Sequence, residues 1–349
     1  MSPRICLVVG DSDTQHCGVK DYAVRLGKAL DNIGLSAEVL APPDWGIKSF
    51  MHFCEELRKR RFDIVHVQYP SIGNRGSLCP HFLGMMKVAT GVVVTLHEFS
   101  ALPLSQRIST HLFRFTSDQL LFTVDTEATK YGRSWITKRV IHIGSNVPVF
   151  SPELPREPTV LYFGQIRPNK GLEEFLELAS RSQQLGKAFK YIVIGSVPQR
   201  RATYFAALRA SPTPGVEWLI DLPFEQVAEL MAGSLAAYLP FPDGASYRRG
   251  SLLAALSNGL PPMTTVGPAT PRDMLDVLLP THDWKEAIKH LDSLHADPGA
   301  ALAFSRAGRI FAERFSWAQI ARQHEMVYLE ALSKAGPSRQ RHYAANTLP

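Results

Sequence analysis

The 349-residue chain lacks long hydrophobic runs and has few cysteines. Its first apolar run, residues 5–9, is shorter than the ~7-residue core of a signal sequence, and no other run approaches the ~18 residues of a spanning helix. Cys6, Cys17, Cys54 and Cys79 form no C-x-x-C pair and match no zinc-site spacing. These absences predict a cytoplasmic protein with reduced thiols and no disulfide framework.

The chain also lacks a strong excess of charge. The 38 lysines and arginines exceed the 32 aspartates and glutamates by only six, and the excess is spread along the sequence. No zinc-finger spacing, RNA-binding signature or basic-aromatic repeat is present, so we expect no nucleic-acid partner. The loop that begins at Gly10 does not read G-x-G-x-x-G, which removes the main support for a nicotinamide cofactor.

Short apolar strands alternate with amphipathic helices along the chain. Short, mainly apolar runs at 5–9, 64–67 and 92–96 are typical of parallel strands that helices cover on both faces. A proline-rich segment, 148–158, interrupts this alternation, and a second one follows it. The pattern predicts an α/β protein of two Rossmann-like, doubly wound domains, 1–147 and 159–316, with 148–158 as the linker. Ligands of such sheets bind at the carboxyl ends of strands, so we expect the domains to face each other across a cleft.

Two candidate site segments follow strands of the first domain. Gly18 stands where a helix begins, and a glycine there lets a backbone N–H approach an anion, although it is also a common turn residue. His97 and Glu98 directly follow the strand at 92–96, where they are placed to face a cleft. The alternative for His97 is a structural histidine in a capped loop.

The second domain opens with a strand, a glycine-containing loop and a helix. Gly164, Arg167 and Lys170 lie in this loop. An arginine fork, a lysine point charge and the positive end of a helix together predict a diphosphate site. The alternative is a pair of solvated surface cations.

A third candidate segment lies between a strand ending near residue 239 and the next helix. Its small residues expose backbone N–H groups, and a serine at the helix start can bind phosphate. Gly244 and Gly250 are expected to be required for close approach or a positive φ. The alternative is a surface loop with a basic flank. The binding candidates are Asp243, Gly244, Ala245, Ser246, Arg248, Arg249, Gly250 and Ser251.

Taken together, these segments resemble the family 4 glycosyltransferases, which are retaining enzymes with the GT-B fold. The likeness covers nearly the whole chain and is carried by Gly18-Val19, Thr95-Leu96-His97-Glu98, Phe163-Gly164 with Lys170-Gly171, the run 252–261, and Phe315-Ser316-Trp317 before the last helix. It implies the GT-B fold. We also expect helix 317–333 to cross back to the first domain and 334–349 to form a disordered tail.

The resemblance also implies a function. The second domain would hold a nucleotide-sugar donor, and the first would hold the acceptor, which is a glycan, a lipid-linked sugar or a small molecule. Arg167 and Lys170 match the phosphate-binding stretch, His97 matches a position that lines the reacting sugar, and Gly18 matches a loop that closes over the diphosphate. The catalytic candidates are His97, Glu98, Arg167 and Lys170, and Gly18 is a binding candidate. Positive groups neutralise the leaving diphosphate, so no metal and no further cofactor are expected.

The sequence departs from the family pattern at two places. The usual pair of glutamates is replaced by Ser246 and Ala254, and the usual Gly-Arg is Gly164-Gln165, where Arg167 is expected to substitute. An epimerase or phosphorylase on the same scaffold is therefore an alternative function. A non-catalytic nucleotide-sugar binding protein is another.

One basic run suggests a membrane contact. Arg58, Lys59, Arg60 and Arg61 end a helix of the first domain. Such a helix could rest on the anionic inner surface of a membrane. The alternative, which we favour, is a solvated basic end that complements the helix dipole.

Overall fold

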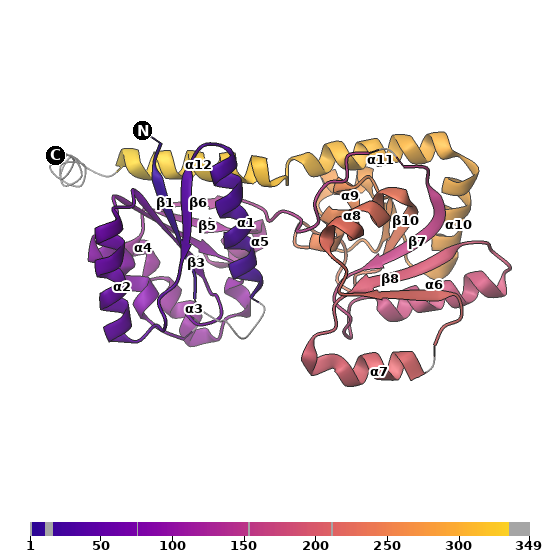
Figure 1. The fold of residues 1–349 in the computed structure, drawn as a ribbon, viewed down its shortest axis with the longest axis horizontal. Coiled ribbons are helices and arrows are strands. Elements are labelled where there is room, and N and C mark those ends of the chain that lie inside the picture. The colour runs from indigo at the N-terminus through magenta and orange to yellow at the C-terminus, as the bar shows by residue number, and fades with distance from the viewer. Residues whose placement is uncertain (1, 11–16, 75, 153, 211, 335–349) are drawn as a thin grey trace. The chain divides into compact units, whose positions relative to one another are not determined.

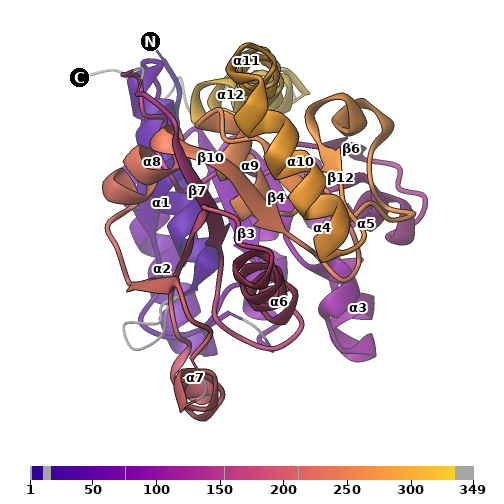
Figure 2. The same ribbon diagram turned by 90° about the vertical axis from the view of Figure 1, so that its right-hand side faces the viewer.

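The structure is a computed structural model that describes residues 2–10, 17–74, 76–152, 154–210 and 212–334. The chain forms two compact units, one of Met1–Ile143 with the chain from Trp317 onward, and one of Gly144–Ser316 (Figures 1 and 2). The division falls before the predicted boundary at 147, because Val147 is buried in the core of the second unit. Residues 335–349, which include most of the predicted tail, lie outside the described residues.

The first unit is built on a parallel six-stranded sheet in the order β2-β1-β3-β4-β5-β6. Its strands are β1 (Arg4–Val8), β2 (Ser36–Leu40), β3 (Ile64–Tyr69), β4 (Gly91–Leu96), β5 (Gln119–Phe122) and β6 (Thr137–Val140). Its helices are α1 (Gly18–Asn32), α2 (Ile47–Arg60), η1 (Cys79–Met86), η2 (Phe99–Ala101), α3 (Leu104–Thr110), α4 (Phe113–Thr116), α5 (Asp125–Lys130) and α12 (Trp317–Lys334).

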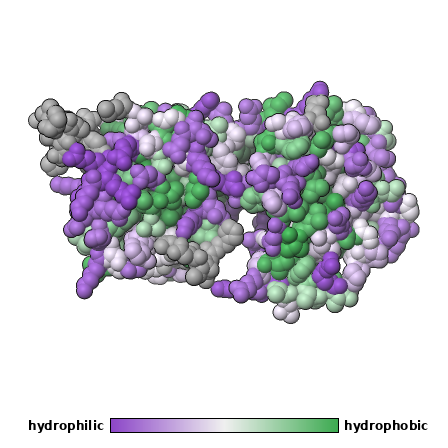
Figure 3. Space-filling model, viewed as in Figure 1, coloured by the Kyte–Doolittle hydropathy of each residue, from purple (hydrophilic) through white to green (hydrophobic). Residues whose placement is uncertain are grey.

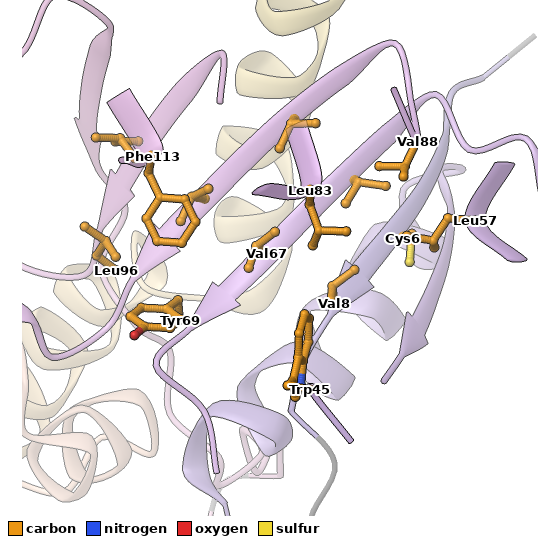
Figure 4. Close-up of a cluster of buried hydrophobic side chains, with 14 of the residues drawn as sticks. Cys6, Val8, Trp45, Leu57, Val67, Tyr69, Leu83, Val88, Leu96 and Phe113 are labelled. Carbon is orange, nitrogen blue, oxygen red and sulfur yellow. The ribbon is translucent and has the colours of Figure 1, made fainter. Parts of the chain in front are cut away.

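Helices cover both faces of this sheet because side chains alternate along each strand. Cys6 and Val8 of β1 belong to a cluster with side chains of α2, η1 and α4 (Figure 4). Ile5 and Leu7 point to the opposite face and belong to a cluster with side chains of α1 and α12, Tyr328 among them. The last helix of the chain therefore completes the core of the first unit.

The second unit repeats the plan with the strand order β12-β11-β10-β7-β8-β9. Its strands are β7 (Glu157–Phe163), β8 (Lys190–Gly195), β9 (Val216–Ile220), β10 (Ser234–Leu239), β11 (Pro262–Thr264) and β12 (Leu279–Pro280). Its helices are α6 (Leu172–Gln184), η3 (Gln199–Arg201), α7 (Ala202–Ala210), α8 (Phe224–Gly233), α9 (Gly250–Ser257), η4 (Arg272–Val277), α10 (Trp284–Ala296) and α11 (Pro298–Glu313).

Each sheet has a point where the strand order reverses. In the first unit it lies between β1 and β3, and in the second it lies between β7 and β10. Loops that leave neighbouring strands in opposite directions open a crevice at the carboxyl ends, which is where doubly wound sheets bind ligands. The prediction of two Rossmann-like, doubly wound domains is confirmed, and ligand sites are expected at the two reversal points.

The surface carries a mixture of polar and apolar side chains. On the face that Figure 3 shows, both units carry hydrophilic and hydrophobic residues, and strongly hydrophilic ones gather at the left side of the first unit. Within the described part of the chain, no helix is both long and apolar enough to cross a membrane. In the basic run at the end of α2, Arg58 donates to the carbonyl of Met86 and Arg60 pairs with Glu38 and Glu56. These contacts give two of its cations structural partners, and the membrane contact stays a prediction.

Candidate functional site

The site of the second unit lies at the reversal point between β7 and β10. These strands are parallel neighbours, so the loops that follow them, 164–171 and 240–249, leave the sheet side by side. Gly171 marks the contact between them: its φ is +79°, and a Cβ there would lie 2.2 Å from the carbonyl oxygen of Pro240. Only glycine fits this position, which fixes the end of the first loop against the start of the second.

Three cations meet at this junction. Partial burial, followed by the positive charges of Arg167 and Arg249, lowers the pKa of Lys170 to about 8. Burial and the charge of Arg167 also lower the pKa of Arg249. Cations that repel one another in a half-buried position are a costly arrangement for a folded protein, and a bound anion would relieve that cost. Arg167, Lys170 and Arg249 are called the cation cluster below.

Only one of the two adjacent arginines belongs to the cation cluster. Arg249 is largely buried, with its guanidinium 4.6 Å from the ring centre of Phe241 and an ion pair to Asp243. Its Nε is buried and without a hydrogen-bond partner among the described residues. Arg248 is exposed. Asp243 is itself 79% exposed, so Arg249 is held by a carboxylate that an incoming anion could replace.

Helix α9 begins next to Arg249. The Leu253 N–H donates to the Arg249 carbonyl over 3.0 Å, which closes the first helical turn. The N–H groups of Gly250, Ser251 and Leu252 precede that bond, as at every helix start, and carry the positive end of the helix dipole. The structure thus brings Ser251 and Gly250 to the same end of the sheet as the cation cluster.

The glycines of the site differ in what they contribute. Gly244 has φ +85°, and a Cβ there would lie 2.6 Å from the Gly267 nitrogen, so glycine is required as predicted. The expected steric need for glycine at 250 is wrong, because φ is not positive there and a Cβ would meet no atom within 4 Å. A Cβ at Gly164 would make only ordinary contacts, the nearest at 3.5 Å.

Three backbone N–H groups of the predicted phosphate loops are already used, one of which is the Gly244 N–H, which donates to the Phe241 carbonyl over 3.0 Å. The Gly164 N–H donates to the Ile194 carbonyl over 3.1 Å, and the Ala245 N–H donates to the Thr265 carbonyl over 2.9 Å. Ser246 accepts from the Arg249 N–H through its carbonyl and so shapes the turn before α9. Neither Gly164 nor Ala245 can offer its N–H to a ligand unless these bonds break.

The position of the family's second glutamate lies inside the core. Ala254 is fully buried in α9 and packs in the same hydrophobic cluster as Leu252 and Leu256. A carboxylate here would have no access to solvent as the helix is packed. Alanine at this position therefore agrees with the packing of α9.

The remaining candidates lie in the first unit. His97 follows β4, is 8% exposed, and places its Nε2 2.8 Å from the Gln68 amide oxygen. Burial, and then the nearby His324, lowers its pKa to about 3, so the imidazole is neutral near pH 7. Glu98 is exposed and its carbonyl accepts from the Ala101 N–H.

Gly18 starts α1 at the carboxyl end of β1. It is exposed, and a Cβ there would meet no atom within 4 Å. Residues 11–16 of the loop before it lie outside the described residues, and with them most of the loop expected to close over the diphosphate.

Sequence reasoning missed a chain of buried polar groups at the reversal point of the first sheet. The Gly10 N–H donates to Ser71 Oγ, the Ser71 N–H to Asn74 Oδ1, and the Asn74 amide to the Gln68 carbonyl. Gln68 then contacts His97. The sequence did offer one signal for Gln68, which directly follows the predicted strand 64–67. Because that strand was predicted to end at residue 67, whereas β3 continues to Tyr69, Gln68 was not considered as a strand residue.

Comparison with known proteins places these features in context. Residues 157–297 match the sequence model of a family described as "Glycosyl transferases group 1". This segment runs from β7 through α10 and contains the cation cluster. No curated protein matches the chain at a significant level.

Several solved structures share the fold over nearly the whole chain. The Anabaena protein Alr3699/HepE, solved in complex with UDP and glucose, is 13% identical with a TM-score of 0.66, over 94% of this chain and 100% of that chain. A glycosyltransferase from Rickettsia africae ESF-5 is 12% identical with a TM-score of 0.68, over 95% and 99% of the two chains. The catalytic domain of starch synthase IV from Arabidopsis thaliana, bound to ADP and acarbose, is 12% identical with a TM-score of 0.60, over 96% and 100%. The chain therefore has the GT-B fold.

Proposed function

We propose that this protein is a retaining glycosyltransferase that uses a nucleoside-diphosphate sugar as donor. The observation that carries the proposal is the cation cluster of Arg167, Lys170 and Arg249 at the reversal point of the second sheet. The family match across this segment and the nucleotides named with the similar structures support it. The retaining outcome rests on the resemblance to family 4.

In this proposal the cation cluster stabilises the leaving diphosphate. Negative charge builds on the diphosphate as the glycosidic bond breaks, and fixed cations in a partly dehydrated site act on it without reorganising. The start of α9 adds backbone donors from Gly250 and Ser251. His97, as a neutral imidazole, lines the sugar without opposing the positive charge that develops at the anomeric carbon. The acceptor is a glycan, a lipid-linked sugar or a small molecule.

The donor proposal is tested by thermal stabilisation. UDP, ADP, GDP, CDP and dTDP are added to the protein, and a ligand at 100 times its Kd stabilises the native state by ~2.7 kcal/mol. We expect one base to raise the unfolding temperature by several degrees, and Lys170→Met to remove the shift while Arg248→Ala keeps it. No shift with any nucleoside diphosphate would refute the donor site.

The reaction is tested on the matching nucleotide sugar. We expect slow hydrolysis without acceptor, and NMR of the first sugar released gives its anomeric configuration, which must equal that of the donor in a retaining enzyme. We also expect EDTA to leave the rate unchanged. This control is needed because the one D-x-D run of the sequence, Asp11-Ser12-Asp13, lies outside the described residues. Metal-reversible loss of activity would contradict the metal-free proposal.

A second candidate function is non-catalytic binding of a nucleotide sugar. Neutral residues at both glutamate positions, Ser246 and the buried Ala254, favour it. It predicts binding of the nucleotide sugar without hydrolysis, epimerisation or transfer to any acceptor. Epimerisation, or phosphate-dependent cleavage, would instead assign another reaction to the same site.

A further inference from the structure

The clearest unexplained feature of the first unit is the contact between Gln68 and His97. Gln68 lies in β3, is fully buried, and directs its amide oxygen to His97 Nε2 at 2.8 Å. An amide oxygen only accepts hydrogen bonds, so the Nε2 of His97 carries the proton. A neutral imidazole has one ring proton, and Nδ1 of His97 is then an acceptor.

The backbone holds both partners in place. β3 and β4 pair in parallel with Gln68 opposite Thr95, and the His97 N–H donates to the Tyr69 carbonyl over 2.9 Å. The Gln68 carbonyl accepts from the Asn74 amide over 3.2 Å. Because the backbone fixes both residues, the Gln68 amide decides which ring nitrogen of His97 is protonated.

The surroundings keep His97 neutral. Among the described residues, the titratable side chains that face it are Tyr22 of α1, whose ring lies edge-on with centroids 5.0 Å apart, His324 of α12, and His66 of β3. All three are buried, and burial lowers the pKa of both histidines and raises that of the tyrosine, so that none of them carries charge near pH 7. None of these three groups is a carboxylate that could stabilise an imidazolium.

A second observation indicates that a polar ligand is missing here. The Nε2 of Gln68 is buried and has no hydrogen-bond partner among the described residues. An unsatisfied buried amide is costly, and the oxygen of a ligand or of a bound water would satisfy it. The amide oxygen of Gln68 thus contacts His97, while its amide nitrogen has no partner among the described residues. Both atoms lie at the carboxyl ends of the strands, where sheets of this kind bind ligands.

We propose that Gln68 is a positioning residue of the sugar site, whose amide oxygen holds the Nε2 proton of His97 so that Nδ1 accepts a hydrogen bond from a hydroxyl group of the bound sugar. This inference rests on the proposed function. It gives a reason for a neutral histidine here, since an imidazolium would repel the oxocarbenium-like charge of glycosyl transfer and could not accept from a hydroxyl.

The test uses three variants of the full chain. Gln68→Leu removes the acceptor, and Gln68→Glu keeps an acceptor while adding a negative charge. Thr95→Val is the matched control, because Thr95 is buried opposite Gln68 and bonds a different histidine, His66, over 2.7 Å. Long-range 15N NMR of the imidazole rings reports the tautomer, and His97→Asn identifies the His97 signals. Hydrolysis of UDP-glucose, which is named with a similar structure, is the kinetic probe if UDP is the nucleotide that binds.

We expect the Nε2–H tautomer in the wild type and in Thr95→Val, and a shift toward Nδ1–H in Gln68→Leu. The value of kcat/KM for hydrolysis should fall about tenfold in Gln68→Leu, the effect of one hydrogen bond, and stay within about twofold in Thr95→Val. The Kd for UDP should not change in any of them. In Gln68→Glu the carboxylate raises the pKa of His97, so activity should be lost on the acidic side where the wild type has no such loss.

Two results would overturn the inference. One is an Nδ1–H tautomer in the wild type, and the other is an equal loss of activity in Gln68→Leu and Thr95→Val with no change of tautomer. If Gln68→Leu does not fold, the wild-type tautomer and the pH profile of Gln68→Glu still decide. A different result would refute the proposed function. If the protein binds no nucleoside diphosphate, the donor site is absent, and the tautomer of His97 has no bearing on that outcome.

Discussion

The pH dependence of nucleotide binding is a direct consequence of the cation cluster. Lys170 binds the diphosphate only when it is protonated, and its pKa in the free protein is about 8 because of burial and the charges of Arg167 and Arg249. A bound diphosphate raises this pKa again. Affinity is therefore full below about pH 8 and falls as the pH rises, until the pKa of the complex is reached.

The size of the effect follows from the pKa. In the free protein, the protonated fraction of Lys170 is 1/(1 + 10^(pH − pKa)). The denominator is about 1.1 at pH 7 and about 30 at pH 9.5. The Kd of the nucleoside diphosphate rises in proportion to this denominator, so we expect it to be about 30 times higher at pH 9.5 than at pH 7. The stability of the free protein should change in the opposite sense: the pKa is below that of an unfolded lysine, so the fold gains stability as the pH rises above about 8.

Isothermal titration at several pH values measures this, with Lys170→Arg as the matched control. An arginine stays charged up to about pH 12, so its Kd should stay flat over the same range. Lys170→Met should bind weakly at every pH. The phosphates of the ligand are fully ionised above about pH 7, and any ionisation of its base acts on all variants alike.

The result that would refute this reasoning is a wild-type Kd that does not change between about pH 7 and about pH 9.5. A parallel rise in the wild type and in Lys170→Arg would refute it as well, because the titrating group would then not be Lys170.

Three further predictions concern affinity and stability. Arg249→Ala should weaken nucleotide binding by ~2 kcal/mol while Arg248→Ala leaves the Kd unchanged, measured by the same titrations; equal losses would place the wrong arginine in the site. Gly171→Ala should cost ~2–4 kcal/mol of unfolding free energy in urea, whereas Gly250→Ala should cost little, because only the former has a positive φ and a carbonyl in the way. Tyr328→Phe should cost ~1–3 kcal/mol, because it leaves a buried histidine nitrogen without its 2.8 Å partner, and an unchanged urea midpoint would contradict that bond.

The fold could be predicted from sequence because its signals are local. Short, mainly apolar runs such as 92–96 are typical of strands covered on both faces, and the structure places β4 at Gly91–Leu96. The short helices α3 and α4 were missed, since each spans too few residues for a helical period to appear. The first unit ends at Ile143 rather than at 147, because Val147 packs in the core of the second unit. Asn258, far along the chain, hydrogen-bonds to Phe150 and Pro148 of the predicted linker, a contact that no local pattern indicates.

The site could be predicted in kind but not in detail. Cations after a strand and before a helix indicated phosphate, and Arg167 and Lys170 lie in the cation cluster. The choice between Arg248 and Arg249 could not be made, because it depends on packing against Phe241. Gln68 was missed because its role depends on pairing with a strand that lies 29 positions away.

The absence of the paired glutamates and the proposed absence of a metal are linked by charge. The cation cluster has three positive charges, and the exposed carboxylate of Asp243 pairs with one of them, Arg249. Glutamates at 246 and 254 would add two negative charges, and the second would have to be buried beside Leu252 and Leu256. A nucleoside diphosphate carries roughly three negative charges near neutral pH. In the proposed function, the neutral Ser246 and Ala254 leave the cations of the cluster free to offset part of that charge, which is why we expect the diphosphate to leave without a divalent ion.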